Sequence, residues 1–563
     1  MHILHLFHEK TIKTIFMTIN KALSVLLVLI LICNLHITVC SEQLETFEKM
    51  QTNSENTQKE SVMFSIESGF YPDEIVLELL TETAADIYYS LDGSIPSRQS
   101  VAYACPIKLN ANEDGVQAYV VRAIAIFPDG SESQVSTRSF FIGQNINNRF
   151  STLVFSIVTD PANLYELPTG IFLQQNLMTH GMDSEREIYL EVFTPEGDIL
   201  TSQNAGMRVN GASSRLHDIK SLKLFARKQY DKQQKVFPQL FFDWSSLEGN
   251  PLQEYKRIVL RNSGNDNVHA FIRDEFIQCL AGQACYPDYE RVQPVVTFLN
   301  GEYYALHWLH ESYSDHYFQS KYGGGTYSII EGSETHMEKS DPKEEEYDPL
   351  ADSFNHTYNM LRELDMTKES NYQLLCSFID VDNYLDYYAL NLFVGNYDWP
   401  NNNVRAFKYV TDGKSVLKGT QDGRWRFLPH DLDYSLGLYG EEHTAASYNH
   451  LADVMTEGNL RYSPLFTSLM NRNDCREYFV NRIYNLMNGA FSSENMLFLL
   501  DAMDAVRSEE LRNWYIPKLK SEGIGEKDKI DLNAELEKSM DQIRRFCIER
   551  PAFMESFLNE QFS

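Results

Sequence analysis

The part of the sequence that decides the fold is a pair of short stretches, NYDWPNNN at residues 396–403 and WRFLPHDLDYSLG at residues 425–437. In the first stretch an Asp lies five residues before an Asn, and in the second two more Asp residues follow an apolar run. Protein kinases space their acceptor-orienting and metal-binding side chains in this way. The oxygen atoms of such side chains are also the ligands that Mg²⁺ prefers. The alternative is that these residues only form turns and helix caps, because Asp and Asn are common in loops.

Several shorter motifs precede these stretches, and their order along the chain is informative. They are RVNGASSR at residues 208–215, KSLKL at residues 220–224, LRNSGND at residues 260–266, IRD at residues 272–274 and NGEY at residues 300–303. Together with the two later stretches, they resemble the CotH kinase family, named for a spore-coat protein, over roughly residues 151–500. The chain departs from the family pattern at Ala305, His307 and His430, where other residues are usual.

The resemblance implies an atypical, secreted, kinase-like fold. Such a protein binds ATP with Mg²⁺ or Mn²⁺ and phosphorylates Ser or Thr hydroxyls of exported proteins. Carried over by position, Asp398 is the catalytic-loop Asp that orients or deprotonates the acceptor. Asp431 is the metal-binding Asp, Asp433 is close behind it as a candidate, and Asn403 is a further candidate ligand. The main rival is a non-catalytic surface scaffold or adhesion protein that keeps the kinase-like fold.

The same resemblance suggests which side chains bind the nucleotide. Lys220 is the first candidate for the phosphate-binding lysine and Lys223 the second. Because they are three residues apart on a predicted strand, they point to opposite faces and only one can serve. Trp425 is expected to stack on adenine, Arg273 to contact a phosphate, and Glu311 to hold the phosphate lysine by an ion pair. The structural alternatives are a surface lysine, a core tryptophan, and an arginine and a glutamate that pair with other residues.

Fold class follows from how the hydrophobic pattern changes along the chain. Residues 61–143 contain short alternating runs separated by Gly, Pro, Asp and Asn, which predicts a small β-sandwich. The segment YYSLDG at residues 88–93, with Pro96, resembles the immunoglobulin-like module of the C-terminal part of chitobiases and hexosaminidases. Residues 151–500 mix predicted strands and helices, and residues 501–563 are predicted to be a helical extension packed on that domain. The chain is therefore predicted to be an α+β protein with an N-terminal β-sandwich and a kinase-like domain.

The N-terminus has the composition of an export signal. Residues 22–33 are mostly apolar and lie behind three lysines, as in a secretory signal peptide, and the run is shorter than a membrane span needs. We therefore expect a signal peptide at residues 1–41, followed by a polar linker at residues 42–60. Lipid attachment at Cys40 is the less favoured alternative. The protein is expected in a periplasm, on a cell surface or in the medium.

Composition and charge exclude several classes of protein. Hydrophobic residues make up 43% and charged residues 23% of the 563 residues, values that rule out a disordered or fibrous chain. The net charge of −30 offers no basic field for nucleic acid. The expected partners are instead an exported protein substrate and a cell-surface polymer or protein docked by the β-sandwich.

Two other enzyme classes fit the sequence less well than a kinase does. His310 and His316 are six residues apart, so they cannot share the i, i+4 geometry of a zinc protease. The segment Asp380-Val-Asp382, like Asp431-Leu-Asp433, has the Asp-x-Asp form that glycosyltransferases use. It is better explained as the acidic start of a helix, where carboxylates are favoured.

Overall fold

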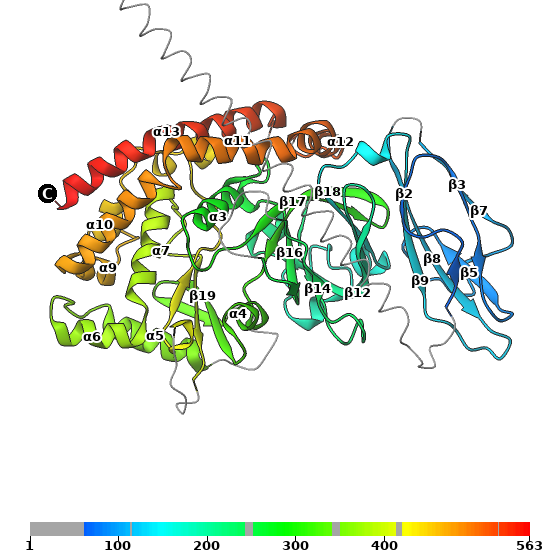
Figure 1. Ribbon diagram of the computed structural model, residues 1–563, viewed down its shortest axis with the longest axis horizontal. Coiled ribbons are helices and arrows are strands. Elements are labelled where there is room, and N and C mark those ends of the chain that lie inside the picture. Colours follow the sequence, from blue (N-terminus) through cyan, green and yellow to red (C-terminus); the bar gives the residue numbers. More distant parts are fainter. Residues whose placement is uncertain are drawn as a thin grey trace, which may run out of the picture. The chain divides into compact units, whose positions relative to one another are not determined.

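The computed structural model describes residues 61–112, 115–242, 251–339, 349–411, 419–526 and 529–562 (Figure 1). The predicted signal peptide, the polar linker and Cys40 lie outside these residues. No helix in the described ranges has the length and apolar character needed to cross a membrane.

The N-terminal part is a two-layered β-sandwich, as predicted. One layer is a five-stranded sheet in the order β2-β9-β8-β5-β6, and the other consists of the pairs β3–β7 and β1–β4. Leu77, Val121 and Phe140 belong to the apolar core between the layers. The strands are β1 (Met63–Phe64), β2 (Gly69–Tyr71), β3 (Ile75–Leu77), β4 (Leu79–Leu80), β5 (Asp86–Ser90), β6 (Val101–Ala102), β7 (Ile107–Leu109), β8 (Gln117–Ile126) and β9 (Ser136–Ile142).

The next part is a closed seven-stranded barrel in the order β10-β11-β12-β13-β16-β18-β17. Apolar residues such as Leu190, Leu224 and Leu260 fill its interior, while alternate residues of the same strands face outward. A helix, α3 (Arg273–Gln283), follows β16. The strands are β10 (Leu153–Val158), β11 (Arg186–Phe193), β12 (Ile199–Asn210), β13 (Ser221–Phe225), β16 (Arg257–Arg261), β17 (Val292–Leu299) and β18 (Glu302–Glu311); α2 (Ala162–Tyr165), β14 (Phe237–Pro238) and β15 (Glu254–Tyr255) lie in the connections.

A second sheet and a long helix follow the barrel. The sheet has the order β20-β19-β21-β22. The helix α7 (Val381–Val394) begins where the Asp380 side chain accepts the Asn383 N–H and ends at Gly395, whose φ of 69° suits a glycine. Residues 396–403, which include Asp398 and Asn403, follow directly after this helix end. The elements are α4 (Asp315–Tyr322), β19 (Tyr327–Ser333), β20 (His336–Lys339), α5 (Pro349–Leu361), α6 (Glu369–Phe378), β21 (Val404–Tyr409) and β22 (Arg426–Leu428).

The C-terminal part is helical and shares one core with α3 and α7. Helix α11 passes through residue 500, so the boundary predicted there falls inside a helix. Helices α11 and α13 lie side by side (Figure 1). Arg550 of α13 is fully buried and donates to the carbonyls of Leu392 and Phe393 at the end of α7. The helices are α8 (His450–Met455), α9 (Pro464–Met470), α10 (Asn473–Asn488), α11 (Ser493–Glu510), α12 (Ile516–Ser521) and α13 (Leu532–Phe562).

An aromatic seam joins the β-sandwich to the barrel. Phe141 of β9 lies edge-on to Phe298 of β17, with ring centroids 4.9 Å apart, and Phe70 of β2 stacks on Phe193 of β11 at 5.7 Å. Beside these rings, Ser68 donates a 2.7 Å hydrogen bond to buried Glu191. The sandwich is therefore packed on the barrel through a continuous apolar cluster.

Candidate active site

A cleft of ≈ 430 Å³ lies between the outer face of the barrel and the second sheet. Arg208 of β12, Lys223 of β13 and Val259 of β16 are register partners and line it together. The alternate residues of these strands point into the barrel interior and are apolar. The charged side chains are therefore found on the outer face, which lines the cleft. The charged and titratable residues of the cleft are His180, Arg208, Arg215, Lys223, Arg261, Glu290, His310, Glu311, Glu331, Arg405, His430, Asp431 and Asp433.

Asp398 lies in the loop after α7 and adjoins the cleft through Asn403. The amide groups of Asn402 and Asn403 donate to its two oxygens at 2.8 and 3.0 Å. Burial and the negative charge of Asp431 raise the pKa of Asp398. Asn403 lines the cleft with a φ of 58°, a left-handed conformation that Asn adopts more readily than most non-glycine residues.

Asp431 and Asp433 lie in the loop after β22. Asp431 also has a positive φ, of 52°. Burial alone would raise its pKa, but the charges of Arg261 and His430 outweigh burial and hold the pKa below its usual value. Asp433 accepts the backbone N–H and the side-chain amide of Asn265 at 2.9 and 3.0 Å. Its burial and the neighbouring Asp431 charge raise its pKa to about 8.

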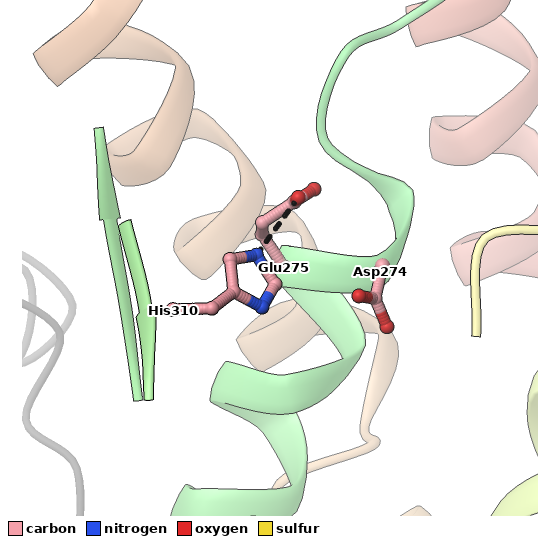
Figure 2. Close-up of side chains that lie close together, drawn as sticks. All are labelled: Asp274, Glu275 and His310. Atoms are coloured by element: carbon pink, nitrogen blue, oxygen red, sulfur yellow. Dashed lines mark hydrogen bonds and ion pairs between the residues drawn. The ribbon is translucent and has the colours of Figure 1, made fainter. Parts of the chain in front are cut away.

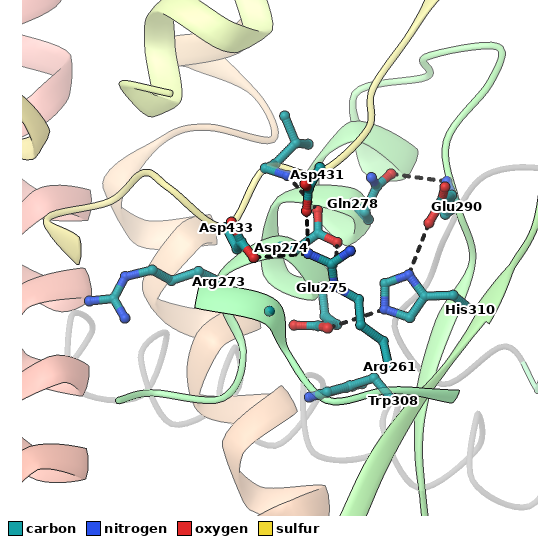
Figure 3. Close-up of polar contacts among 12 residues, drawn as sticks. Arg261, Arg273, Asp274, Glu275, Gln278, Glu290, Trp308, His310, Asp431 and Asp433 are labelled. Atoms are coloured by element: carbon teal, nitrogen blue, oxygen red, sulfur yellow. Dashed lines mark hydrogen bonds and ion pairs between the residues drawn. The ribbon is translucent and has the colours of Figure 1, made fainter. Parts of the chain in front are cut away.

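Arg261, at the end of β16, is the centre of the site (Figure 3). Its Nη2 lies 2.5 Å from Asp431 Oδ1 and 2.9 Å from Asp433 Oδ2, and its Nε lies 3.5 Å from Asp274 Oδ2. A Cβ on Gly264 would collide with Asp433 Oδ2 and approach Arg261 Nη2 to 2.9 Å. Only glycine therefore lets the chain pass so close to this ion cluster.

The first turn of α3 fixes the loop that carries the acidic residues. Asp274 Oδ1 accepts the backbone N–H of Leu432 at 3.0 Å, which ties the helix to the residue between Asp431 and Asp433. The next residue, Glu275, is also fully buried, and its carboxylate pairs with His310 of β18 at 3.1 Å (Figure 2).

Asp274, Glu275 and His310 lie close enough together to suggest a metal site, but the hydrogen bonds argue against one. His310 Nε2 bonds Glu275 and its Nδ1 bonds Glu290 at 3.0 Å, so neither ring nitrogen is left to bind a metal. Burial alone would lower the pKa of His310, but these two carboxylates raise it to about 9. The group is thus an internal ion network that supports the cleft.

The chain matches two known families. Residues 207–554, more than half of the chain, match the family model described as CotH kinase protein. The chain belongs to the CotH kinase family. Residues 76–140 match the family described as Fn3 associated, in agreement with the expected immunoglobulin-like module. A comparison with curated proteins gave no match.

Membership in the CotH kinase family makes this a kinase-like protein, and the structure shows where each expected residue lies. Lys220 does not line the cleft. It is buried before β13, and its Nζ donates to the carbonyls of Arg215 and His217. Lys223 lines the cleft instead. The structure thus brings Lys223, the second candidate, to the cleft and leaves Lys220, the first candidate, outside it.

Trp425 and Arg273 are also away from the cleft. Trp425 is 1% exposed and packs edge-on against Phe354 of α5, so it cannot stack on a nucleotide base. Arg273 is fully buried and forms an ion pair with Asp266, and Figure 3 shows it pointing away from Arg261. In both cases the structural alternative is correct.

Glu311 does line the cleft, with partners other than the expected lysine. It accepts a hydrogen bond of 3.1 Å from the Tyr255 hydroxyl and one of 3.2 Å from the backbone N–H of Arg291. The central ion pairs are formed by Arg261 and Asp274, which were not among the residues predicted from the sequence to form the site. Both lie in motifs that supported the family resemblance, LRNSGND and IRD. The sequence therefore marked these segments, but a role in the site was predicted for Arg273 rather than for Arg261 or Asp274.

The residues at the end of the cleft suit a hard divalent cation. Asp431, Asp433 and Asn403 offer carboxylate and amide oxygens, which Mg²⁺ and Mn²⁺ prefer. The amide nitrogen of Asn403 already donates to Asp398, and its oxygen accepts no hydrogen bond from the described part of the chain. Burial, and after it the neighbouring Asp431 charge, raises the pKa of Asp433, and a bound cation would favour the ionised carboxylate.

Proposed function

We propose that this protein is a metal-dependent kinase that transfers the γ-phosphoryl group of ATP to Ser or Thr hydroxyls of exported proteins. One observation carries the proposal. Asp431, Asp433, Asn403 and, behind it, Asp398 converge on one cleft that also presents several cationic side chains. Phosphoryl transfer requires little more than such groups in a fixed arrangement.

Asp398 is the residue proposed to act on the acceptor. Its two oxygens are held by the amides of Asn402 and Asn403, so the carboxylate has a fixed orientation. A carboxylate in this state can accept a hydrogen bond from a Ser or Thr hydroxyl and take its proton as the phosphate bond forms. Its raised pKa makes it a better proton acceptor than an ordinary Asp.

The cations of the cleft are proposed to bind the phosphates. Lys223 points outward from β13, and Arg405 of β21 is held by its ion pair with Glu331. They matter more here than in a neutral protein, because a net charge of −30 repels ATP. A divalent ion held by Asp431, Asp433 and Asn403 would neutralise further phosphate charge.

Export and docking belong to the same proposal. The apolar stretch at residues 22–33 behind its lysines supports export. The β-sandwich contributes no residue to the cleft and has its own core, which supports a role as a spacer or as a module that docks a surface polymer or protein.

The test is transfer of ³²P from γ-labelled ATP by the purified protein with Mg²⁺ or Mn²⁺, with and without an exported Ser-rich protein as acceptor. The variants are Asp398→Asn and Asp431→Asn, and Asp382→Asn is the matched control, because Asp382 is exposed at the start of α7 and outside the cleft. We expect a loss of about 10³-fold or more in the first two, as for removal of a central catalytic group, and no change in the control.

The other outcomes separate the alternatives. ATP binding without transfer in the wild type would favour a nucleotide-binding scaffold. If the wild type neither binds ATP nor transfers phosphate, the enzyme hypothesis is contradicted and a surface binding protein is favoured. Loss of transfer in Asp382→Asn, with Asp431→Asn still active, would contradict the assignment of the active site to this cleft.

A further inference from the structure

Arg261 occupies a position that the proposed reaction leaves unexplained. It ends β16, and the next helix is α3, which begins with Arg273 and Asp274. In protein kinases, a lysine on the strand before the corresponding helix pairs with an acid of that helix and reaches the nucleotide phosphates. Here the strand residue is an arginine, and its helix partner is Asp274, 3.5 Å from Nε.

The same guanidinium holds the oxygens expected to bind the metal. Its Nη2 contacts Asp431 Oδ1 and Asp433 Oδ2 at 2.5 and 2.9 Å. A divalent cation and the arginine would therefore compete for the same lone pairs. A unit positive charge this close to a second cation is strongly unfavourable in a partly buried site.

The two acids are not equally free to change partners. Asp433 is 1% exposed, and Asn265 donates to both of its oxygens. The side chain of Asp431 is 30% exposed and lies at the mouth of the site. Asp431 can thus leave Arg261 without unpairing a buried group, whereas Asp433 and Asp274 keep the guanidinium in place.

Arginine suits such an exchange better than lysine does. It stays charged at any physiological pH and has five N–H donors in a planar fork, so it can keep two carboxylates while offering a donor to a phosphate. Nε of Arg261 is buried and faces Asp274 Oδ2 at 3.5 Å, so this end of the guanidinium stays with that carboxylate.

We propose that Arg261 is the resident counter-ion of the metal site and the positioning residue for the nucleotide phosphates. Without metal and nucleotide it holds Asp431. When both bind, the guanidinium gives up Asp431, keeps Asp433 and Asp274, and donates to a phosphate oxygen. This inference rests on the proposed function for its second step, but its first step concerns metal binding alone.

The first step is tested by Mn²⁺ binding in the absence of nucleotide, measured by calorimetry on the purified protein. The variants are Arg261→Gln and Arg261→Lys, with Arg257→Gln as a control on the same strand that does not line the cleft. Removal of the competing charge should make Arg261→Gln bind Mn²⁺ about tenfold more tightly than the wild type. Arg261→Lys should show a smaller gain in the same direction, and the control none.

The second step is tested by the affinity for the Mn²⁺ complex of a non-hydrolysable ATP analogue. Arg261→Gln should bind this complex about tenfold more weakly than the wild type, although it binds Mn²⁺ alone more tightly. This opposite response is not expected of an arginine with only a structural role. Thermal unfolding without metal shows whether each variant is folded, and Arg261→Lys serves if the Gln variant is not.

Unchanged or weaker Mn²⁺ binding by a folded Arg261 variant would overturn the counter-ion role, whether or not the wild type is an active kinase. Tighter Mn²⁺ binding with unchanged affinity for the analogue complex would overturn the phosphate role. If the wild type transfers no phosphate but the two affinities shift in opposite directions, the inference stands and only the proposed function fails.

Discussion

Two buried regions of this molecule join distant segments of the chain, and they do so by opposite means. The aromatic seam joins the β-sandwich to the barrel through phenylalanine rings, among them Phe70, Phe141 and Phe298. The ion cluster around Arg261 joins β16, α3 and the loop after β22 through carboxylates and a guanidinium. Apolar burial stabilises a junction at little cost, whereas buried charges cost desolvation energy that their pairing only partly offsets.

The difference indicates what each region is for. A junction needed only for attachment is built most simply from rings, and the seam fits that description. The ion cluster lies at a cleft and combines backbone strain at Asp431 with a glycine at position 264 that tolerates no side chain. Buried charged side chains in such a place are better explained by a role in binding or catalysis than by a contribution to stability.

The largest effect on stability is expected at the seam. Phe141→Ala removes a fully buried ring that contacts Phe70, Phe193 and Phe298. It should lower the free energy of unfolding by about 3–5 kcal/mol, measured by urea denaturation. Phosphoryl transfer per folded molecule should not change. The exposed Val76→Ala is the control, and lost activity in a folded Phe141→Ala protein would break the distinction between the two regions.

The ion network beside Arg261 should lose stability at alkaline pH. The pKa of His310 is raised from 6.5 to about 9 by its two carboxylate partners, which outweigh burial. The stabilisation is therefore complete below pH 6.5 and disappears as the pH rises to 9. Its full size is about 3 kcal/mol. His310→Gln should flatten the stability profile in this window, and a wild-type profile that is already flat there would contradict the assignment.

The seam should respond in a different pH window. Burial raises the pKa of Glu191 from 4.5 to about 7, despite a hydrogen bond from Ser68 that opposes the shift. The folded protein then binds more protons than the unfolded chain between these values, so stability falls as the pH rises from 4.5 to 7. The loss is about 3 kcal/mol, and Glu191→Gln should remove it. If stability is lost only above pH 7, the titrating group is not Glu191.

Much of the fold was predictable because its signals are local. Alternation predicted the sandwich, and the acidic segment Asp380–Asp382 marks the start of α7 as the sequence suggested. The strand β18 was not predicted, because it contains His310 and Glu311, which local pattern places in solvent. They are buried only because α3 and residues near Glu290 provide their partners.

The site was predictable in part, for the same reason. Asp398, Asn403, Asp431 and Asp433 occur in recognisable motifs, and the structure brings them to one cleft or its border. Trp425 was misassigned because its burial depends on Phe354, which lies about 70 residues earlier in the sequence, on helix α5. No property of residues 425–437 alone shows that this ring is covered.

The smallest effect we predict separates the two lysines. Lys223→Met should raise the KM for ATP about tenfold, because it removes a cation from the cleft. Lys220→Met should leave the KM within about threefold of the wild type, because this lysine only binds the carbonyls of the β12–β13 turn. It should instead lower stability by about 1 kcal/mol. Steady-state kinetics and thermal unfolding of both variants test this prediction. A larger change of KM in Lys220→Met than in Lys223→Met would indicate that Lys220 binds the phosphates.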